Sequence, residues 1–146
     1  MRILILNGPN INQIGFREPS IYGTKTYRDL CHFLKQKGKS FHQKIKIKQS
    51  NYEGYLITQL QKASQKFDYV ILNAGGFTHT SIALKDAIAC CLIPVIEVHL
   101  SDVDHREDFR KINFIRNQCE CSFYGKGFLS YEEALLYIQT KEKKEV

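Results

Sequence analysis

Short apolar runs alternate with segments of helical periodicity along the chain. The runs at residues 3–6, 69–72 and 95–98 consist mostly of Ile, Leu and Val, and each therefore predicts a strand buried on both faces. Residues 44–48 alternate lysine with isoleucine, a pattern typical of an edge strand with one polar face. A fifth strand is expected at residues 119–124. Because helical segments separate the strands, the pattern predicts an α/β fold, a flavodoxin-like three-layer sandwich with a five-stranded parallel sheet.

The segments between these strands carry helix signals. Thr26 and Asp29 fit a capping box at the start of a helix, which Gly38 would end after about residue 37. Ser130 and Glu133 fit a second capping box, which predicts that the last helix continues through about residue 139. The other helices are expected at 52–66, with Leu56, Leu60 and Ala63 at helical spacing, at 81–91, with Ile82, Ala83, Ala87 and Ile88 on one stripe, and at 107–115.

Length and composition fit one catalytic domain, at residues 1–140, followed by a charged tail at 141–146. The five cysteines show no disulfide spacing, no apolar stretch approaches the ~20 residues of a membrane helix, and the N-terminus has no signal-peptide pattern. We therefore expect a cytoplasmic protein that has no membrane partner. The net charge of +6 lies on scattered lysines without a basic-aromatic motif, which argues against nucleic acid and favours an anionic metabolite as the ligand.

Polar residues follow three of the predicted strands, at positions 7–10, 73–81 and 97–101. The carboxyl ends of parallel strands meet at one edge of a sheet, and open α/β folds bind their ligands there. Amide, imidazole and glycine groups from the three segments should therefore line one crevice. The pattern predicts an active site at this edge.

The segment from Asn7 to Thr24 is much longer than an ordinary βα loop of about 2–6 residues. It contains Arg17 and Tyr22, and Gly15 and Gly23 are candidate hinges. Long loops of this kind are usually either functional lids or disordered segments. We expect the segment to act as a lid over the crevice.

Five polar motifs occur in one order along the chain. They are Asn-Gly-Pro-Asn at 7–10, Arg-Glu-Pro at 17–19 with Tyr-Gly at 22–23, Gln-Ser-Asn-x-Glu-Gly at 49–54, Asn-Ala-Gly-Gly-Phe-Thr-His-Thr-Ser at 73–81, and Glu-Val-His-Leu-Ser at 97–101 with Arg106 and Arg110. With these motifs the chain resembles type II 3-dehydroquinate dehydratase over residues 1–138. The resemblance implies a lyase that converts 3-dehydroquinate to 3-dehydroshikimate by eliminating water through an enolate. The pathway would be the shikimate route to aromatic amino acids, or alternatively quinate catabolism.

The same resemblance implies a role for each residue of the site. Tyr22 would be the base that removes a proton next to the ketone, Arg17 would lower the pKa of Tyr22, and His99 would be the general acid for the departing hydroxyl. Asn10 would help to hold a water that stabilises the enolate. The substrate would be bound by Asn73, His79, the backbone at Leu100 and Ser101, and Arg110. Asp86 would reach into the site of a neighbouring subunit in a homo-oligomer, a dodecamer built from trimers. No metal and no organic cofactor would be needed.

Two other interpretations stay open at this point. Glu97 and His99 lie on one strand face, and His79 could approach them, which allows a metal site of two histidines and one carboxylate, although Glu97 could instead orient His99. A flavodoxin-like domain could also bind FMN at these strand ends, but Pro9 removes a backbone donor that a phosphate-binding loop needs.

Four residues depart from the family pattern. Asp102 stands where asparagine is usual and adds a negative charge beside the expected anion site. Asn113, Cys121 and Ser130 stand where serine, glycine and glycine are usual. These three lie near the last strand and the start of the last helix, so they bear on packing and assembly more than on chemistry.

Overall fold

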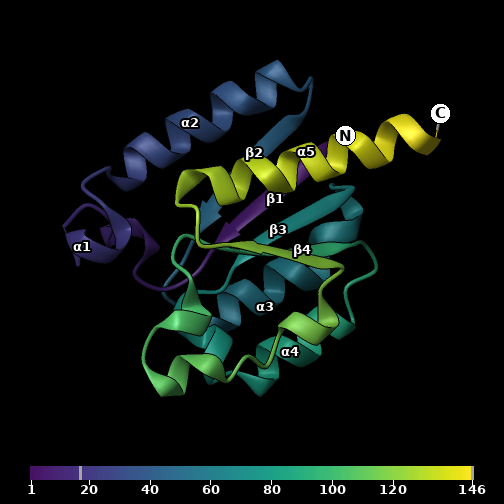
Figure 1. The fold of residues 1–146 in the computed structure, drawn as a ribbon. Helices are drawn as coiled ribbons and strands as arrows, with labels where there is room; N and C mark the ends of the chain where they lie inside the picture. The colour runs from purple at the N-terminus through teal and green to yellow at the C-terminus, as the bar shows by residue number, and fades with distance from the viewer. Residues whose placement is uncertain (17, 146) are drawn as a thin grey trace.

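The computed structural model describes residues 1–16 and 18–145 and contains a five-stranded parallel sheet (Figure 1). The strands are β1 (Arg2–Asn7), β2 (Lys44–Gln49), β3 (Tyr69–Asn73), β4 (Val95–His99) and β5 (Cys121–Tyr124). Their order across the sheet is β2-β1-β3-β4-β5, which is the flavodoxin-like order. The predicted fold class is confirmed.

Burial distinguishes the central strands from the edge strand. All residues of β3 and β4 are buried, as the apolar runs predict. On β1, Ile3 and Ile5 face one core, and Leu4 and Leu6 face the other. β2 lies at the edge of the sheet, where its isoleucines pack against the first core and its lysines alternate with them. The lysines protect the open edge from pairing with another chain.

Helices cover both faces of the sheet (Figure 1). α2 (Tyr27–Ser40) and α5 (Phe128–Glu145) pack on one face, and α3 (Glu53–Lys62) and α4 (Ile82–Ala89) pack on the other. Leu30 and Leu34 of α2 enter the first core, while Leu56 and Leu60 of α3 enter the second. The three-layer arrangement explains why the central strands are apolar on both sides.

The second helix begins as predicted but ends later. Thr26 and Asp29 form the capping box, in which each side chain bonds the backbone of the other residue. The helix does not stop at Gly38 but continues to Ser40. A Cβ at position 38 would lie 2.6 Å from Cδ1 of Ile45, so the glycine permits close packing between α2 and β2. The sequence prediction mistook a packing glycine for a stop signal.

Three further predictions of helix position were wrong. α5 begins at Phe128, so Ser130 lies inside the helix, where its Oγ accepts a hydrogen bond from the Lys126 backbone N–H at 3.0 Å. α5 also runs beyond residue 139 to Glu145. The short helix predicted at 107–115 is present only as a 3-10 helix at Asp108–Lys111. In α4 the buried residues are Leu84, Ala87 and Ile88, whereas Ile82 and Ala83 are exposed.

Short helical turns connect the larger elements. They are η1 (Ile11–Gln13) and α1 (Pro19–Tyr22) between β1 and α2, η2 (Ala63–Gln65) after α3, η3 (Gly75–His79) after β3, and η4 (Val103–His105), η5 (Asp108–Lys111) and η6 (Arg116–Gln118) between β4 and β5. In the described ranges, no helix has the length and apolar character that crossing a bilayer requires.

The end of β1 lies against the end of β3, at the point where the strand order reverses. Asn7 pairs in register with Asn73, and the Gly8 N–H donates to the Asn73 carbonyl at 2.7 Å. A Cβ at Gly8 would lie 2.6 Å from the carbonyl oxygen of Ala74, so a side chain there would collide with fixed backbone. A crevice lies beside this contact, outside the ends of β1, β3 and β4. This is the position of ligand sites in doubly wound sheets.

Candidate active site

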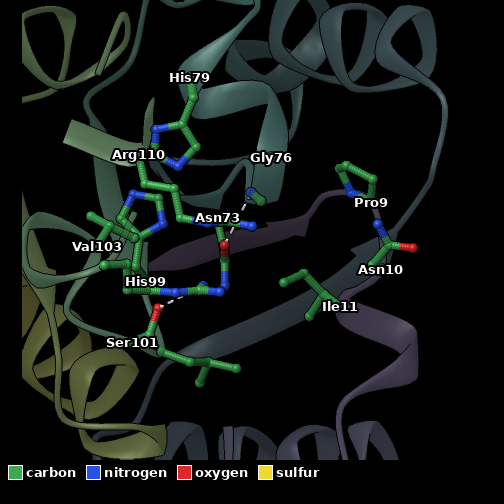
Figure 2. A pocket seen from close by; sticks show the side chains of 13 residues that line it. Pro9, Asn10, Ile11, Asn73, Gly76, His79, His99, Ser101, Val103 and Arg110 are labelled. Carbon is green, nitrogen blue, oxygen red and sulfur yellow. Dashed lines mark hydrogen bonds between the residues drawn. The ribbon is translucent and has the colours of Figure 1, made fainter. Parts of the chain in front are cut away.

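A cavity of about 190 Å³ occupies this crevice. In Figure 2, His79, His99, Ser101 and Arg110 stand on one side, and Asn10 stands with its neighbours on the opposite side. The cavity is lined by Pro9, Asn10, Ile11, Asn73, Gly75, Gly76, His79, His99, Leu100, Ser101, Val103, Arg106 and Arg110. The segments after β1, β3 and β4 therefore share one pocket, as predicted.

His99 is the last residue of β4 and forms a buried pair with Glu97. The Nε2 atom of His99 lies 2.6 Å from Oε1 of Glu97, and the Glu97 side chain is fully buried. Burial alone would raise the pKa of the Glu97 carboxyl, but hydrogen bonds from His99, Ser122 and Asn113 lower that pKa to about 2. Glu97 is therefore a fixed anion beside His99 at neutral pH.

His79 ends the short helix η3 and lies on the same side of the pocket as His99 (Figure 2). Its Nδ1 lies 2.6 Å from the carbonyl oxygen of Ile112, which can only accept, so Nδ1 carries a hydrogen. Burial lowers the pKa of His79, and the nearby His99 and Arg110 act in the same direction. A neutral ring with Nδ1 protonated can accept a hydrogen bond at Nε2, as a substrate hydroxyl would require.

Asn73 ends β3 and is held by a buried hydrogen-bond network. The Tyr131 hydroxyl donates to Oδ1 of Asn7 at 2.7 Å and accepts from Nδ2 of Asn73 at 2.9 Å. The Oδ1 atom of Asn73 in turn accepts from the Gly75 N–H at 3.2 Å. Helix α5 thereby fixes which way the Asn73 amide points and ties it to the Gly75-Gly76 turn of the pocket wall.

Two arginines give the pocket its positive charge. The Arg106 side chain is 8 % exposed; its Nη1 lies 3.5 Å from Oγ of Ser101, and its Nη2 is 3.1 Å from Oε2 of Glu18, just before α1. The Arg110 side chain is 17 % exposed and donates through Nε to Glu107 at 2.8 Å. Guanidinium groups in a partly buried pocket suit a carboxylate ligand.

The residue Asp102, a departure from the family pattern, is engaged in local bonds. Its Oδ1 accepts from the Asp104 N–H at 3.2 Å, and its Oδ2 lies 2.7 Å from Nδ1 of His105. Asp102 is not among the residues that line the pocket. These bonds hold the Asp102 carboxylate against the start of η4.

The structure brings most of the predicted site residues together, places Asp86 elsewhere, and does not describe Arg17 or the side chain of Tyr22. Asp86 is exposed on α4 and does not line this pocket. Arg17 lies outside the described residues. For Tyr22 the structure describes the backbone, in α1, and not the side chain. The pocket-lining residues that were predicted are Asn10, Asn73, His79, His99, Leu100, Ser101 and Arg110.

Sequence reasoning missed the residues that support the site. Arg106 was noted in a motif but received no role, although it lines the pocket. Asn113, Arg116 and Ser122 all donate hydrogen bonds to Glu97. The one sequence signal for such partners was a polar residue, Ser122, in an otherwise apolar or aromatic strand.

The metal interpretation of Glu97, His79 and His99 does not fit the geometry. Both Glu97 oxygens accept hydrogen bonds from side chains, and one of these bonds comes from Nε2 of His99 itself. Across residues 1–16 and 18–145, no group of three or more His, Cys, Asp and Glu side chains is arranged to hold a metal ion. The arrangement suits a carboxylate that orients an imidazole.

Known proteins resemble the chain along nearly its whole length. A family model described as dehydroquinase class II matches residues 1–139. A 3-dehydroquinate dehydratase of Fusobacterium nucleatum subsp. nucleatum is 45% identical over 141 residues, which are 94% of this chain and 96% of that protein. A catabolic 3-dehydroquinase of Talaromyces marneffei is 39% identical over 144 residues, or 99% of this chain and 82% of that protein. The crystal structure of a type II dehydroquinase from Butyrivibrio crossotus has a TM-score of 0.91 at 37% identity, and the match covers 96% of this chain and 97% of that one. By sequence and by fold, the chain belongs to the class II dehydroquinase family.

Proposed function

We propose that this lyase eliminates water from 3-dehydroquinate to form 3-dehydroshikimate. One observation carries the proposal beyond family membership: the pocket joins the imidazole of His99, paired with a buried anion, to the cations Arg106 and Arg110. An imidazole in this setting can exchange a proton, and the guanidinium groups can hold an anionic substrate.

The elimination needs a base and an acid on the substrate. In our proposal the Tyr22 phenolate takes the proton next to the ketone, and the electron pair of that C–H bond forms an enolate. As the enolate collapses, the C–O bond of the leaving hydroxyl breaks, and protonated His99 gives it a proton, so that water departs. A proton then returns from the Tyr22 phenol to His99 through solvent, which restores both groups.

The remaining residues bind or stabilise. Arg17 favours the phenolate form of Tyr22, and Asn10 holds a water against the enolate oxygen. His79 and Asn73 contact the ring hydroxyls. The backbone at Leu100 and Ser101, together with Arg110, receives the carboxylate. Asp86 contributes from a neighbouring subunit. The proposed assembly, a dodecamer built from trimers, is therefore part of the mechanism.

The test follows the product directly. 3-Dehydroshikimate contains a conjugated enone, so purified protein given 3-dehydroquinate should produce a rising ultraviolet absorbance. We expect the same rate after dialysis against EDTA, because neither step calls for a Lewis acid. No absorbance change with fresh substrate would refute the proposed reaction. Loss of turnover in EDTA, with recovery on adding zinc or iron, would refute the metal-free mechanism.

The pathway is a separate question from the reaction. We propose a role in the cytoplasm, in the biosynthesis of aromatic amino acids. The relative named catabolic 3-dehydroquinase in Talaromyces marneffei favours quinate breakdown as a second candidate. Deleting the gene in its host separates them, because loss of the biosynthetic enzyme creates a requirement for aromatic amino acids. Loss of growth on quinate alone would show the catabolic role.

A further inference from the structure

The buried Glu97 carboxylate accepts four hydrogen bonds from side chains, two on each oxygen. Oε1 accepts from Nε2 of His99 and from Nδ2 of Asn113, both at 2.6 Å. Oε2 accepts from Oγ of Ser122 at 2.7 Å and from Nε of Arg116 at 3.1 Å. Of these four donors, only His99 lines the pocket. The other three lie behind it and act on the pocket through Glu97.

Asn113 and Ser122 are themselves held in place. The Oδ1 atom of Asn113 accepts from the backbone N–H groups of Ile115 at 3.0 Å and Arg116 at 2.9 Å, so its amide can turn only Nδ2 toward Glu97. Ser122 is on β5, directly opposite Glu97 in the register of the parallel pair. The carboxylate therefore has little freedom to rotate or to move toward the pocket.

This arrangement determines which nitrogen of His99 faces the ligand. An ionised carboxylate only accepts hydrogen bonds, so the Nε2 atom of His99 must carry a hydrogen. Within the part of the chain that the structure describes, no other group hydrogen-bonds the His99 ring. In neutral His99 the hydrogen is then on Nε2, and Nδ1 is the atom left for the pocket.

We propose that Asn113 and Ser122 are positioning residues that fix the Glu97 carboxylate, so that His99 keeps its hydrogen on Nε2 and exchanges protons with the substrate through Nδ1. This inference rests on the proposed dehydration, in which His99 is the general acid. In that step the Nδ1–H bond breaks as the new O–H bond forms on the departing hydroxyl. His99 is left neutral with its hydrogen on Nε2, still bonded to Glu97.

Two substitutions each disturb one of these bonds. Asn113→Asp keeps the size of the side chain and the oxygen that caps the following turn, but replaces the amide donor with a second carboxyl group, and two carboxyl groups in contact share a proton. Ser122→Ala removes the hydroxyl at Oε2. Arg116 is a poorer probe, because it also bonds Asp104 at 3.3 Å and lies 4.5 Å from the Tyr124 ring centre.

Each variant has a matched control. Ser122→Thr keeps the hydroxyl and should restore wild-type behaviour. Asn117→Asp makes the same chemical change as Asn113→Asp four residues away, at an exposed side chain that makes none of these hydrogen bonds. Circular dichroism and urea unfolding establish that each variant is folded, and Ser122→Ala carries the test should Asn113→Asp fail to fold.

Nitrogen NMR of the ligand-free protein shows which nitrogen of the His99 ring carries the hydrogen, and the measurement needs no turnover. We expect Nε2–H in the wild type, and a mixture of tautomers or an altered spectrum in Ser122→Ala and Asn113→Asp.

In the turnover assay we expect kcat to fall about tenfold or more with KM nearly unchanged, since general acid catalysis contributes about 10²–10⁴-fold and these residues do not touch the substrate. The pH dependence of kcat should differ from that of the wild type in both variants, because each changes the hydrogen bonds of the carboxylate that bonds His99.

The two proposals fail in different ways. Wild-type protein that does not turn over 3-dehydroquinate overturns the reaction, while the NMR spectra still decide the role of Asn113 and Ser122. Folded variants with the wild-type His99 spectrum and pH profile overturn the positioning role. A wild-type spectrum that shows the hydrogen on Nδ1 instead of Nε2 overturns the assignment of the reacting nitrogen.

Discussion

A tyrosine is a weak base at neutral pH, because its ordinary pKa is near 10. Bringing that pKa close to 7 requires about 4 kcal/mol of extra stabilisation for the phenolate. One cation about 4 Å away at an effective dielectric near 20 supplies about this amount. Arg17 is the proposed source. Arg106 is nearly buried and bonds Glu18, which lies in the same segment as Tyr22. This segment therefore contacts the positive wall of the pocket.

The Tyr22→Phe substitution tests the proposed base. It deletes the proton acceptor and keeps the ring, so kcat should fall by about 10²–10⁴-fold while the circular dichroism spectrum is unchanged. Tyr55→Phe is the matched control, since Tyr55 lies on α3 with 40% of its surface exposed and does not line the pocket. Nearly normal turnover by Tyr22→Phe would remove this tyrosine from the mechanism.

Gly38 affects the stability of α2 in two opposing ways, through helix propensity and through packing. Alanine inside a helix is more favourable than glycine by about 1 kcal/mol. At Gly38, however, the added Cβ would meet Cδ1 of Ile45 at 2.6 Å and the carbonyl oxygen of Gln43 at 3.2 Å. Overpacking of this kind costs about 1–3 kcal/mol, so packing should outweigh propensity.

We therefore expect Gly38→Ala to lower the free energy of unfolding by about 1 kcal/mol, measured by urea denaturation. Ile45→Val removes the Cδ1 atom that the new methyl group would meet. In the Ile45→Val background the cost of Gly38→Ala should be smaller, although Cγ1 of residue 45, 2.9 Å from the added Cβ, is still present. The packing explanation is wrong if the cost of Gly38→Ala is the same in both backgrounds.

Periodicity and strand-end chemistry predicted the elements better than their boundaries. The three central strands were correct because each buried run is short, apolar and followed by polar residues, whereas the fifth strand begins at Cys121 and not at residue 119. Thr26 was correct because a capping box is a local interaction. Gly38 misled because its role depends on packing against Ile45, which only the folded chain brings near. Ser130 misled because it lies inside the helix and its hydroxyl bonds the backbone of Lys126, just before the helix begins.

The same distinction applies to the site. Most residues that line the pocket lie just after predicted strands and could be found from the sequence, whereas Arg106 lies well beyond the end of β4 and received no role. The partners of Glu97 could not, because Asn113 and Ser122 reach it from the irregular segment before β5 and from β5 itself. Sheet order and register decide those contacts, and neither is visible in a local pattern.

At the scale of the whole molecule, large apolar side chains are exposed on several elements, and the face formed by α3 and α4 is one of these places. Large apolar residues are exposed around α3 and α4, the helices that share the second core: Tyr52 (78%), Tyr55 (40%) and Ile82 (59%). Asp86 is exposed on α4 as well. Clustered apolar side chains on a protein surface often mark contacts with another chain. This face is therefore where we expect a neighbouring subunit to approach.

A site shared between subunits makes a prediction that a self-contained site does not. Light scattering should show an oligomer well above a dimer, and Asp86→Ala should reduce turnover while Asp108→Ala, at a side chain that is 96% exposed, should not. The sharper test mixes two defective proteins, Tyr22→Phe and Asp86→Ala, after dissociating and reassembling them together. Because closed symmetric assemblies repeat one interface, some mixed sites would then pair an intact Tyr22 from one chain with an intact Asp86 from its neighbour. Activity should reappear in the mixture and stay low when each variant is reassembled alone. No recovery in mixed oligomers, or full activity in a wild-type monomer, would return Asp86 to an ordinary solvated residue of α4.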